Sequence, residues 1–332
     1  MKPLEQSIYK TLAYFDLLNF PLTREELFRY LWQPPRMGFE EFVAFAMPQE
    51  KDGCYFFSGR EPIVAERREA SKISDQKLEI ARRAVKLIRS VPFLRAIFIC
   101  NSVGAGMARP ESDVDFFIVA EKKRVWIVRL FTNLVLRCLG LRTYGSHQAN
   151  RICLSFYVDT AHLDLAPWRV ADDDIHFAYW LHQMKPIYDP LQYYEKFLRA
   201  NRWVEKYLPN MTNTPHGHPP ARGESPNSRL DGEAAGSPNP PSQGGTRGVL
   251  VAESRLGHIW KKMWEAMWRG SYGVMVEREA KKLQLTKMKL SLQAKAKLPD
   301  HGVVLTDSII KLHENDTRKV LREKWLEKCK NI

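Results

Sequence analysis

Two apolar runs, separated by a short loop that ends in paired aspartates, constrain the fold of this chain more than any other feature. The runs read LRAIFICN at 94–101 and DVDFFIVA at 113–120, and both are typical of buried strands. An apolar helical pattern follows at 125–141, and a third run, ICLSFYVD, occupies 152–159. The order strand, loop, strand, helix, strand predicts an α+β fold in which helices flank a small mixed sheet.

Asp113 and Asp115 are two residues apart at the start of the second run, so their side chains point to the same face of a strand. Val114, Phe116 and Ile118 then point into a core on the opposite face. Two neighbouring carboxylates repel each other, and a divalent cation removes the repulsion. Carboxylate oxygens suit Mg²⁺ or Mn²⁺, so the pair predicts a metal site, although D-x-D is also common on ordinary loops.

The loop between the two runs has residues suited to a triphosphate. Ser102 follows directly on the first run, and Gly104 and Gly106 would let backbone N–H groups approach a ligand closely. Arg109, in the same loop, is a further expected nucleotide-binding residue. The loop has no G-K-[ST] sequence and lacks the third glycine of a dinucleotide fingerprint. A hydroxyl, free amides and two nearby carboxylates together predict a site for a nucleoside triphosphate and its metal.

These residues resemble the nucleotidyltransferase superfamily related to DNA polymerase β, whose members have a Gly-Ser motif, a short loop and a D-x-D. The resemblance is most specific over 94–160. Over 1–210 the chain is similar to a group of uncharacterised bacterial proteins that join a winged-helix-like segment to a nucleotidyltransferase domain. That wider similarity rests on YFDLLNFPLT, NSVGAGMARPESDVDFFIV and ICLSFYVD. The expected sheet is therefore nucleotidyltransferase-like.

The resemblance also implies a reaction. Ser102 would contact the β- and γ-phosphates of a nucleoside triphosphate, of which ATP is the expected one. Asp113 and Asp115 would hold two metal ions, which would activate an attacking hydroxyl and stabilise the departing pyrophosphate. The implied activity is the transfer of a nucleoside monophosphate to a hydroxyl on a protein, an RNA or a small molecule.

The chain departs from the family pattern at two places. Asn101 stands where glycine is usual, and a side chain there crowds the phosphate approach. The third carboxylate of the family is predicted to be Asp159, at the far end of the next strand, with Asp164 as a weaker candidate. If Cys153 or Ser155 occupies the ligand position instead, the general base is missing. The alternative is then a catalytically silent nucleotide-binding member that docks DNA or a protein.

The N-terminal residues predict three short helices followed by a β element. Residues 5–17 repeat apolar positions at helical spacing, Thr23 and Glu26 form a capping box, and a third helix is expected at 39–47. KDGCYFFSGR then reads as a tight turn entering a short strand. This order is typical of a winged helix, which binds DNA or docks a protein. The third helix is acidic and aromatic, which disfavours recognition of base edges.

The second half of the chain contains an abrupt change in composition. Residues 172–208 read as helices interrupted at Pro186. Residues 211–250 then contain 7 Pro and 7 Gly and no aromatic residue, which predicts a disordered insertion. Residues 251–332 read as basic helices, and 254–332 hold 18 Lys or Arg against 9 Asp or Glu. This excess favours polyanions such as nucleic acid, nucleotides or anionic lipid, and any DNA binding is expected to be weak and independent of sequence.

Cysteine usage and hydropathy indicate the compartment. The 5 cysteines are scattered without a C-x-x-C, which fits a reducing cytoplasm and argues against a disulfide framework or a zinc site. The apolar segment 125–141 is short and contains Arg129 and Arg137, so no membrane insertion is expected.

Three tryptophans at spacing four are expected to pack in a core: Trp260, Trp264 and Trp268. The predicted parts are a winged-helix-like domain at 1–63, a connecting helix at 64–92, a nucleotidyltransferase-like domain at 93–210, the insertion at 211–250 and the basic helical region at 251–332.

Overall fold

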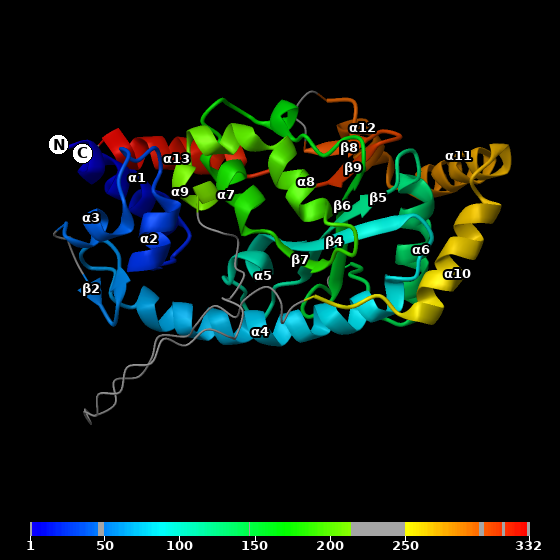
Figure 1. Cartoon of the computed structure of the whole chain (residues 1–332), viewed down its shortest axis with the longest axis horizontal. Coiled ribbons are helices and arrows are strands. Elements are labelled where there is room, and N and C mark those ends of the chain that lie inside the picture. The colour runs from blue at the N-terminus through cyan, green and yellow to red at the C-terminus, as the bar shows by residue number, and fades with distance from the viewer. Residues whose placement is uncertain are drawn as a thin grey trace, which may run out of the picture.

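A computed structural model describes residues 2–45, 50–145, 147–213, 250–298, 302–313 and 316–330. Helices and strands form a mixed arrangement, which confirms the predicted α+β class (Figure 1). The predicted connecting helix is α4 (Ile63–Ile88), which runs beneath both the N-terminal elements and the larger sheet (Figure 1). The predicted insertion at 211–250 lies almost wholly outside the described residues.

The N-terminal elements form a small unit of helices and a three-stranded antiparallel sheet in the order β1-β3-β2. Its elements are α1 (Pro3–Leu17), β1 (Leu22–Thr23), α2 (Arg24–Tyr30), α3 (Phe39–Val43), β2 (Glu50–Lys51) and β3 (Cys54–Tyr55). The predicted capping box is confirmed, because the Glu26 amide donates to Thr23 Oγ1 at 3.3 Å and the Thr23 amide donates to Glu26 Oε2 at 3.0 Å. The described α3 covers only the first part of the helix predicted at 39–47, and residues 46–49 lie outside the described residues.

The larger sheet has the strand order β7-β4-β5-β6-β9-β8 within the described residues. Its strands are β4 (Leu94–Cys100), β5 (Val114–Ala120), β6 (Ile152–Asp159), β7 (Lys185–Tyr188), β8 (Val303–Leu305) and β9 (Ile309–Leu312). Strand β5 is antiparallel to β4 and parallel to β6, and α6 (Val125–Cys138) connects β5 to β6. The three runs read from the sequence are therefore the three central strands.

Two sequence predictions about this sheet are corrected. Pro186, expected to interrupt a helix, lies within β7, which is an edge strand and so tolerates a residue without a backbone N–H. The region 251–332, expected to be helical, also contributes β8 and β9. These two strands are short, and β9 pairs with β6, a partner far away in the sequence. Such pairing leaves little local signal.

Both faces of the larger sheet are covered by helices. Val114, Phe116 and Ile118 pack with α4 and α6 on one face, as predicted. Phe117 of β5 packs on the other face, with α7 (Ile175–Gln183) and α8 (Tyr193–Ala200). Because side chains alternate along a strand, Asp115 shares the face of Phe117. Shorter helical segments accompany these elements: η1 (Ala166–Trp168), η2 (Arg202–Lys206) and α9 (Pro209–Asn213).

The C-terminal helices are α10 (Arg255–Met267), α11 (Ser271–Thr286), α12 (Leu290–Lys295) and α13 (Arg318–Lys330). Helices α10 and α11 lie at one end of the molecule and α13 lies toward the other (Figure 1). Helix α13 returns to α1, where Trp325 Nε1 donates to the carbonyl of Lys10 at 2.9 Å, so both termini lie at one end. Of the three tryptophans expected in a core, Trp268 is buried, whereas Trp260 is 52% exposed. Within the described ranges, no helix has the length and apolar character needed to cross a bilayer.

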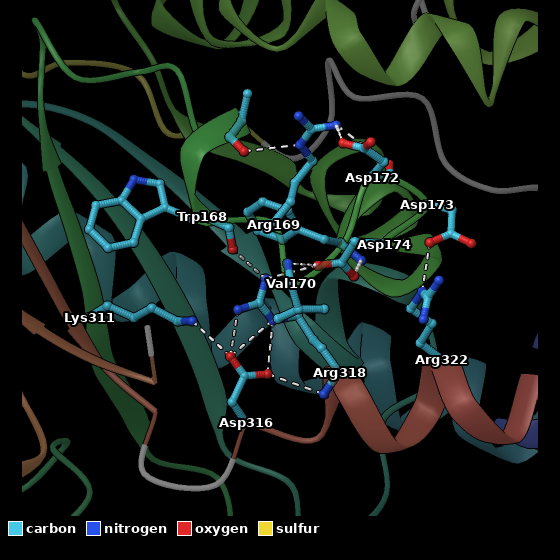
Figure 2. Close-up of polar contacts among 12 residues, drawn as sticks. Trp168, Arg169, Val170, Asp172, Asp173, Asp174, Lys311, Asp316, Arg318 and Arg322 are labelled. Atoms are coloured by element: carbon cyan, nitrogen blue, oxygen red, sulfur yellow. Dashed lines mark hydrogen bonds and ion pairs between the residues drawn. The ribbon is translucent and has the colours of Figure 1, made fainter. Parts of the chain in front are cut away.

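A buried ionic network holds the start of α13 against α7 (Figure 2). Arg318 lies between Asp174, at 3.2 Å, and Asp316, at 2.6 Å, and Lys311 of β9 reaches Asp316 at 3.0 Å. Asp174 also caps α7 by accepting from the Phe177 amide at 3.1 Å. Burial raises the pKa of Asp316, but the hydrogen bond from Arg318 and the charge of Lys311 bring that pKa well below its usual range. The network therefore joins β9, α7 and α13.

Candidate functional site

The aspartate pair, Asp113 and Asp115, lies at the entry of β5, next to the parallel strand β6. Cys153 of β6 is the register partner of Asp115. One ligand atom from each of these three residues lies within 4.8 Å of the others. In the part of the chain that the structure describes, this is the one group of three or more His, Cys, Asp or Glu side chains this close together. The Cys153 thiol therefore lies close to both of the predicted carboxylates.

Burial and mutual repulsion make the charged form of the pair unfavourable. Burial, and then the charge of Asp113, raise the pKa of Asp115 to about 7, against hydrogen bonds from Asn101 and Cys153. Burial also raises the pKa of Asp113, and burial followed by the charge of Asp115 raises the pKa of the Cys153 thiol far above its ordinary value. The positive charge of Arg142 opposes these shifts, because it lowers the pKa of all three groups. A bound cation would stabilise the ionised carboxylates further.

A five-residue helix that the sequence did not predict, α5 (Asn101–Ala105), opens directly after β4. Asn101 has φ 54°, in the left-handed region that glycine and asparagine adopt more readily than other residues. This conformation accounts for an asparagine at this position. The Asn101 side chain is held on both sides, because Oδ1 accepts from Trp180 Nε1 at 2.7 Å and the amide donates to Asp115. Asn101 therefore orients one carboxylate of the pair.

The predicted phosphate-loop residues have different roles in the structure. Ser102 lies in the first turn of α5, and its hydroxyl has no hydrogen-bond partner among the described residues. Gly104 is buried, and a Cβ there would lie 2.7 Å from the carbonyl oxygen of Ile99, so this glycine is required for packing against β4. Gly106 ends α5 with φ 77°, and its amide donates to the Val103 carbonyl at 3.3 Å. Only Ser102 and the first turn of α5 remain as groups for a phosphate.

Arg109, the further residue expected to bind nucleotide, lies in the loop between α5 and β5. The residue is exposed, and it lines a cleft of about 250 Å³ between the loop, α4 and the end of α1. The described residues that line this cleft do not include the aspartate pair. This cleft is therefore lined by residues other than the aspartate pair, and nucleotide binding by Arg109 stays a prediction.

A buried lysine that the sequence analysis missed supports the loop before β5. Lys77 of α4 donates from Nζ to the carbonyls of Pro110 and Ser112, at 3.0 and 2.7 Å, and to Asn150 Oδ1 at 2.8 Å. The Arg109 amide in turn donates to Ser112 Oγ at 3.0 Å. The sequence pattern of α4 indicates which of its apolar residues are buried. It does not distinguish Lys77, the one buried lysine of this helix, from the exposed lysines.

The prediction of Asp159 as the third carboxylate is corrected by the strand register. Asp159 pairs with Ala120, five residues beyond the aspartate pair along β5, which is about 17 Å at the usual strand rise. Its Oδ1 accepts from the Ala161 amide at 2.9 Å and contacts His162 Nδ1 at 2.6 Å, so it caps the turn after β6. Asp164, the weaker candidate, lies beyond that turn and binds its own loop. Neither carboxylate is near the pair.

A bulge in β6 decides which side chain lies beside the pair. The register with β5 shifts between Cys153 and Phe156, so residues beyond the bulge no longer follow simple alternation. Tyr157 consequently packs in the same core as Leu154, three residues earlier, on the face opposite Phe117. Ser155 is buried, with Oγ 3.4 Å from His313 Nε2 of the segment that follows β9. Cys153 is therefore the residue of β6 that completes the cluster.

Comparison of the chain with models of known protein families, with curated proteins and with solved structures finds no match. The chemistry of the site is therefore argued from its own geometry. The geometry consists of two carboxylates of raised pKa, a neighbouring thiol, and the first turn of a helix that begins one strand away.

Proposed function

We propose that the aspartate pair, with Cys153, holds a divalent cation that binds the triphosphate of a nucleotide. The observation that supports this most is the crowding of two carboxylates whose charged forms burial disfavours. Buried charges without partners are costly, so such a pair is expected to have a compensating ligand. Carboxylate oxygens fit Mg²⁺ or Mn²⁺, and a thiol beside them shifts the preference from Mg²⁺ toward Mn²⁺ or another softer ion.

The activity that fits this site is the transfer of a nucleoside monophosphate from a nucleoside triphosphate, with ATP the expected donor, to a hydroxyl acceptor. The Ser102 hydroxyl and the first turn of α5 contact the phosphates. Asp113 and Asp115 hold the cation, and Asn101 keeps the Asp115 carboxylate in place. The bound ion would supply neutralisation of the charge on the departing pyrophosphate. The acceptor hydroxyl belongs to a protein, an RNA or a small molecule.

A second candidate, a nucleotide-binding protein that does not catalyse transfer, is favoured by one observation. Cys153 occupies the position beside Asp115 where the resemblance implies a third carboxylate, and burial keeps its thiol protonated. The acceptor hydroxyl then lacks its expected base. The element order α1, β1, α2, α3, β2, β3 supports a winged-helix-like N-terminal unit, which would dock DNA or a protein. The acidic Glu40 and Glu41 of α3 favour a protein over DNA bases.

Transfer of label from α-labelled nucleotides tests the proposal and separates the two candidates. The full chain is incubated with each nucleoside triphosphate, Mg²⁺ or Mn²⁺, and a cell extract as the source of acceptor. We expect labelled product with the wild type and none with Asp115→Asn. Asp164→Asn is the matched control, because Asp164 is an exposed carboxylate outside the site, and it should retain transfer. Nucleotide binding without transfer by the wild type would favour the silent candidate.

A further inference from the structure

Helix α10 lies at the end of the molecule opposite the termini (Figure 1), and one side of it exposes a stripe of apolar side chains to solvent. We use the name α10 stripe for five side chains, each 52–80% exposed: Leu256, Ile259, Trp260, Met263 and Met267. Their spacing of three, four, seven and eleven residues from the first places them on one side of the helix. A monomeric protein rarely leaves such a continuous row of large apolar side chains in water.

The opposite side of α10 is firmly attached to the protein, so the outward direction of the stripe is fixed. Glu265 accepts from the Phe93 amide at 2.6 Å and pairs with Arg95 at 2.7 Å. Trp268 stacks on Phe131 of α6, with ring centroids 5.6 Å apart. The stripe is therefore not a core face that a small rotation of α10 would bury.

The exposed charges of α10 and α11 are almost all positive. Helices α10 and α11, together with the turn between them, expose five basic side chains: Arg255, Lys262, Arg269, Arg278 and Lys282. Two of their three acidic residues point into the protein, because Glu265 binds Arg95 and Glu277 accepts from the Trp126 amide at 2.7 Å. Glu279 is the remaining acidic residue, and it is exposed. At 3.6 residues per turn, Arg255 and Lys262 border the stripe on one side.

We propose that the α10 stripe docks on the surface of an anionic lipid bilayer, with α10 lying in the plane of the interface. An amphipathic helix with Trp, Met, Leu and Ile on one side and bordering Lys or Arg has the chemistry of interfacial binding. The apolar side chains enter the boundary between headgroups and acyl chains, and the basic side chains bind anionic headgroups. No part of the chain needs to cross the bilayer, and the proposal is independent of the nucleotide site.

Charge complementarity favours an anionic bilayer over a second copy of the chain or a nucleic acid as the partner of the α10 stripe. A second copy of the chain would bring two positively charged surfaces together, which costs energy at an interface. A nucleic acid would satisfy the basic side chains but leave the α10 stripe in water, because phosphate contacts use no apolar surface. An anionic bilayer satisfies both the apolar and the basic groups.

Co-sedimentation of the full chain with vesicles tests the proposal. We expect binding to vesicles in which phosphatidylcholine is mixed equally with phosphatidylglycerol, and much weaker binding to phosphatidylcholine alone. Met263→Glu should abolish binding, because it places a negative charge in the centre of the stripe. Val320→Glu is the matched control: Val320 is 50% exposed and Met263 54%, both are on helices, and α13 lies toward the other end (Figure 1). The control should bind as the wild type does.

A charge variant separates the two contributions. Lys262→Gln with Arg269→Gln should weaken binding to the anionic vesicles about thirtyfold, since each basic residue near such a surface contributes about fivefold. Vesicle binding that is absent in the wild type, or that survives Met263→Glu, would overturn the proposal. Two other outcomes, each without vesicle binding, would also overturn the proposal. A concentration-dependent dimer that Met263→Glu abolishes would show that a second copy of the chain binds the stripe. Binding of duplex DNA that the charge variant abolishes would show that nucleic acid binds this surface.

Discussion

Asp115 and Cys153 are register partners on the parallel strands β5 and β6, so a thiol lies beside the buried carboxylate. The proposed nucleotidyl transfer would need a third carboxylate on this neighbouring strand. Under that proposal, the residue at position 153 is the one that bears most on activity, because Asp113 and Asp115 lie close together.

Cys153→Asp should increase the response to Mg²⁺. A third carboxylate would add an oxygen ligand and a negative charge beside the pair, and Mg²⁺ prefers oxygen ligands. We expect thermal stabilisation by Mg²⁺ with ATP to become larger than in the wild type, and a tenfold gain in affinity corresponds to about 1.4 kcal/mol at saturating ligand. Cys153→Ser is the control, since its hydroxyl adds no charge. Equal responses of both variants would show that residue 153 is not a ligand.

The stability of the metal-free protein should depend on pH through Asp115. Burial and the charge of Asp113 raise the pKa of Asp115 to about 7. Between about pH 4 and this value, the folded state therefore holds a proton that the unfolded chain has released. Stability accordingly decreases as the pH rises through this window, and Asp115→Asn makes that decrease smaller, because Asp113 and Glu277 also have raised pKa values. Melting temperatures of both proteins are compared in chelator, and a difference between them that does not change with pH would disprove the assignment.

Lys77→Met should weaken the site without removing any predicted ligand. Lys77 binds the carbonyls of Pro110 and Ser112 in the loop that leads into β5. Leaving these acceptors unpaired costs about 1–3 kcal/mol of stability and loosens the entry of the aspartate pair. Urea unfolding and the melting shift with Mn²⁺ and ATP are the measurements. Lys86→Met, an exposed lysine of the same helix, should change neither; similar losses in both variants would argue against a role for the buried contacts.

Arg318→Leu should destabilise the fold strongly. The substitution leaves Asp174 and Asp316 without the cation between them, and breaking a buried ion pair costs about 3–5 kcal/mol. The comparison is Arg322→Leu, because the pair of Arg322 with Asp173 is partly exposed and such pairs contribute about 0–1 kcal/mol. Both values come from urea unfolding. Equal small losses would show that the buried network does not hold α13.

Local patterns predicted much of the fold and half of the site. The three central strands, α4, α6 and the capping box of α2 follow from short-range periodicity and were read directly. Strands β8 and β9 were missed because both are short and because β9 is held in the sheet by pairing with the distant β6. Helix α5 was missed because it is five residues long and begins at Asn101 with a positive φ.

The sequence did not determine which residue of the third run lies beside the aspartate pair. It left Cys153 and Ser155 as alternatives to Asp159. Simple alternation put Cys153, Ser155 and Asp159 on one face, and the acidic residue was chosen on chemical grounds. The bulge after Cys153 ends that alternation, and the register puts Asp159 at the other end of the strand. Bulges depend on the neighbouring strands and leave no pattern in a single run. The roles of Asn101 and Lys77 likewise depend on partners distant in the sequence.

The most direct test of the central claim is the melting temperature of the full chain with and without Mn²⁺ and ATP. The claim is that the aspartate pair binds a cation together with a nucleotide, and a ligand that binds only the folded state raises its stability. We predict an increase for the wild type that requires both Mn²⁺ and ATP, and no increase for Asp113→Asn with Asp115→Asn. An equal increase in the double variant, or none in the wild type, would contradict the claim.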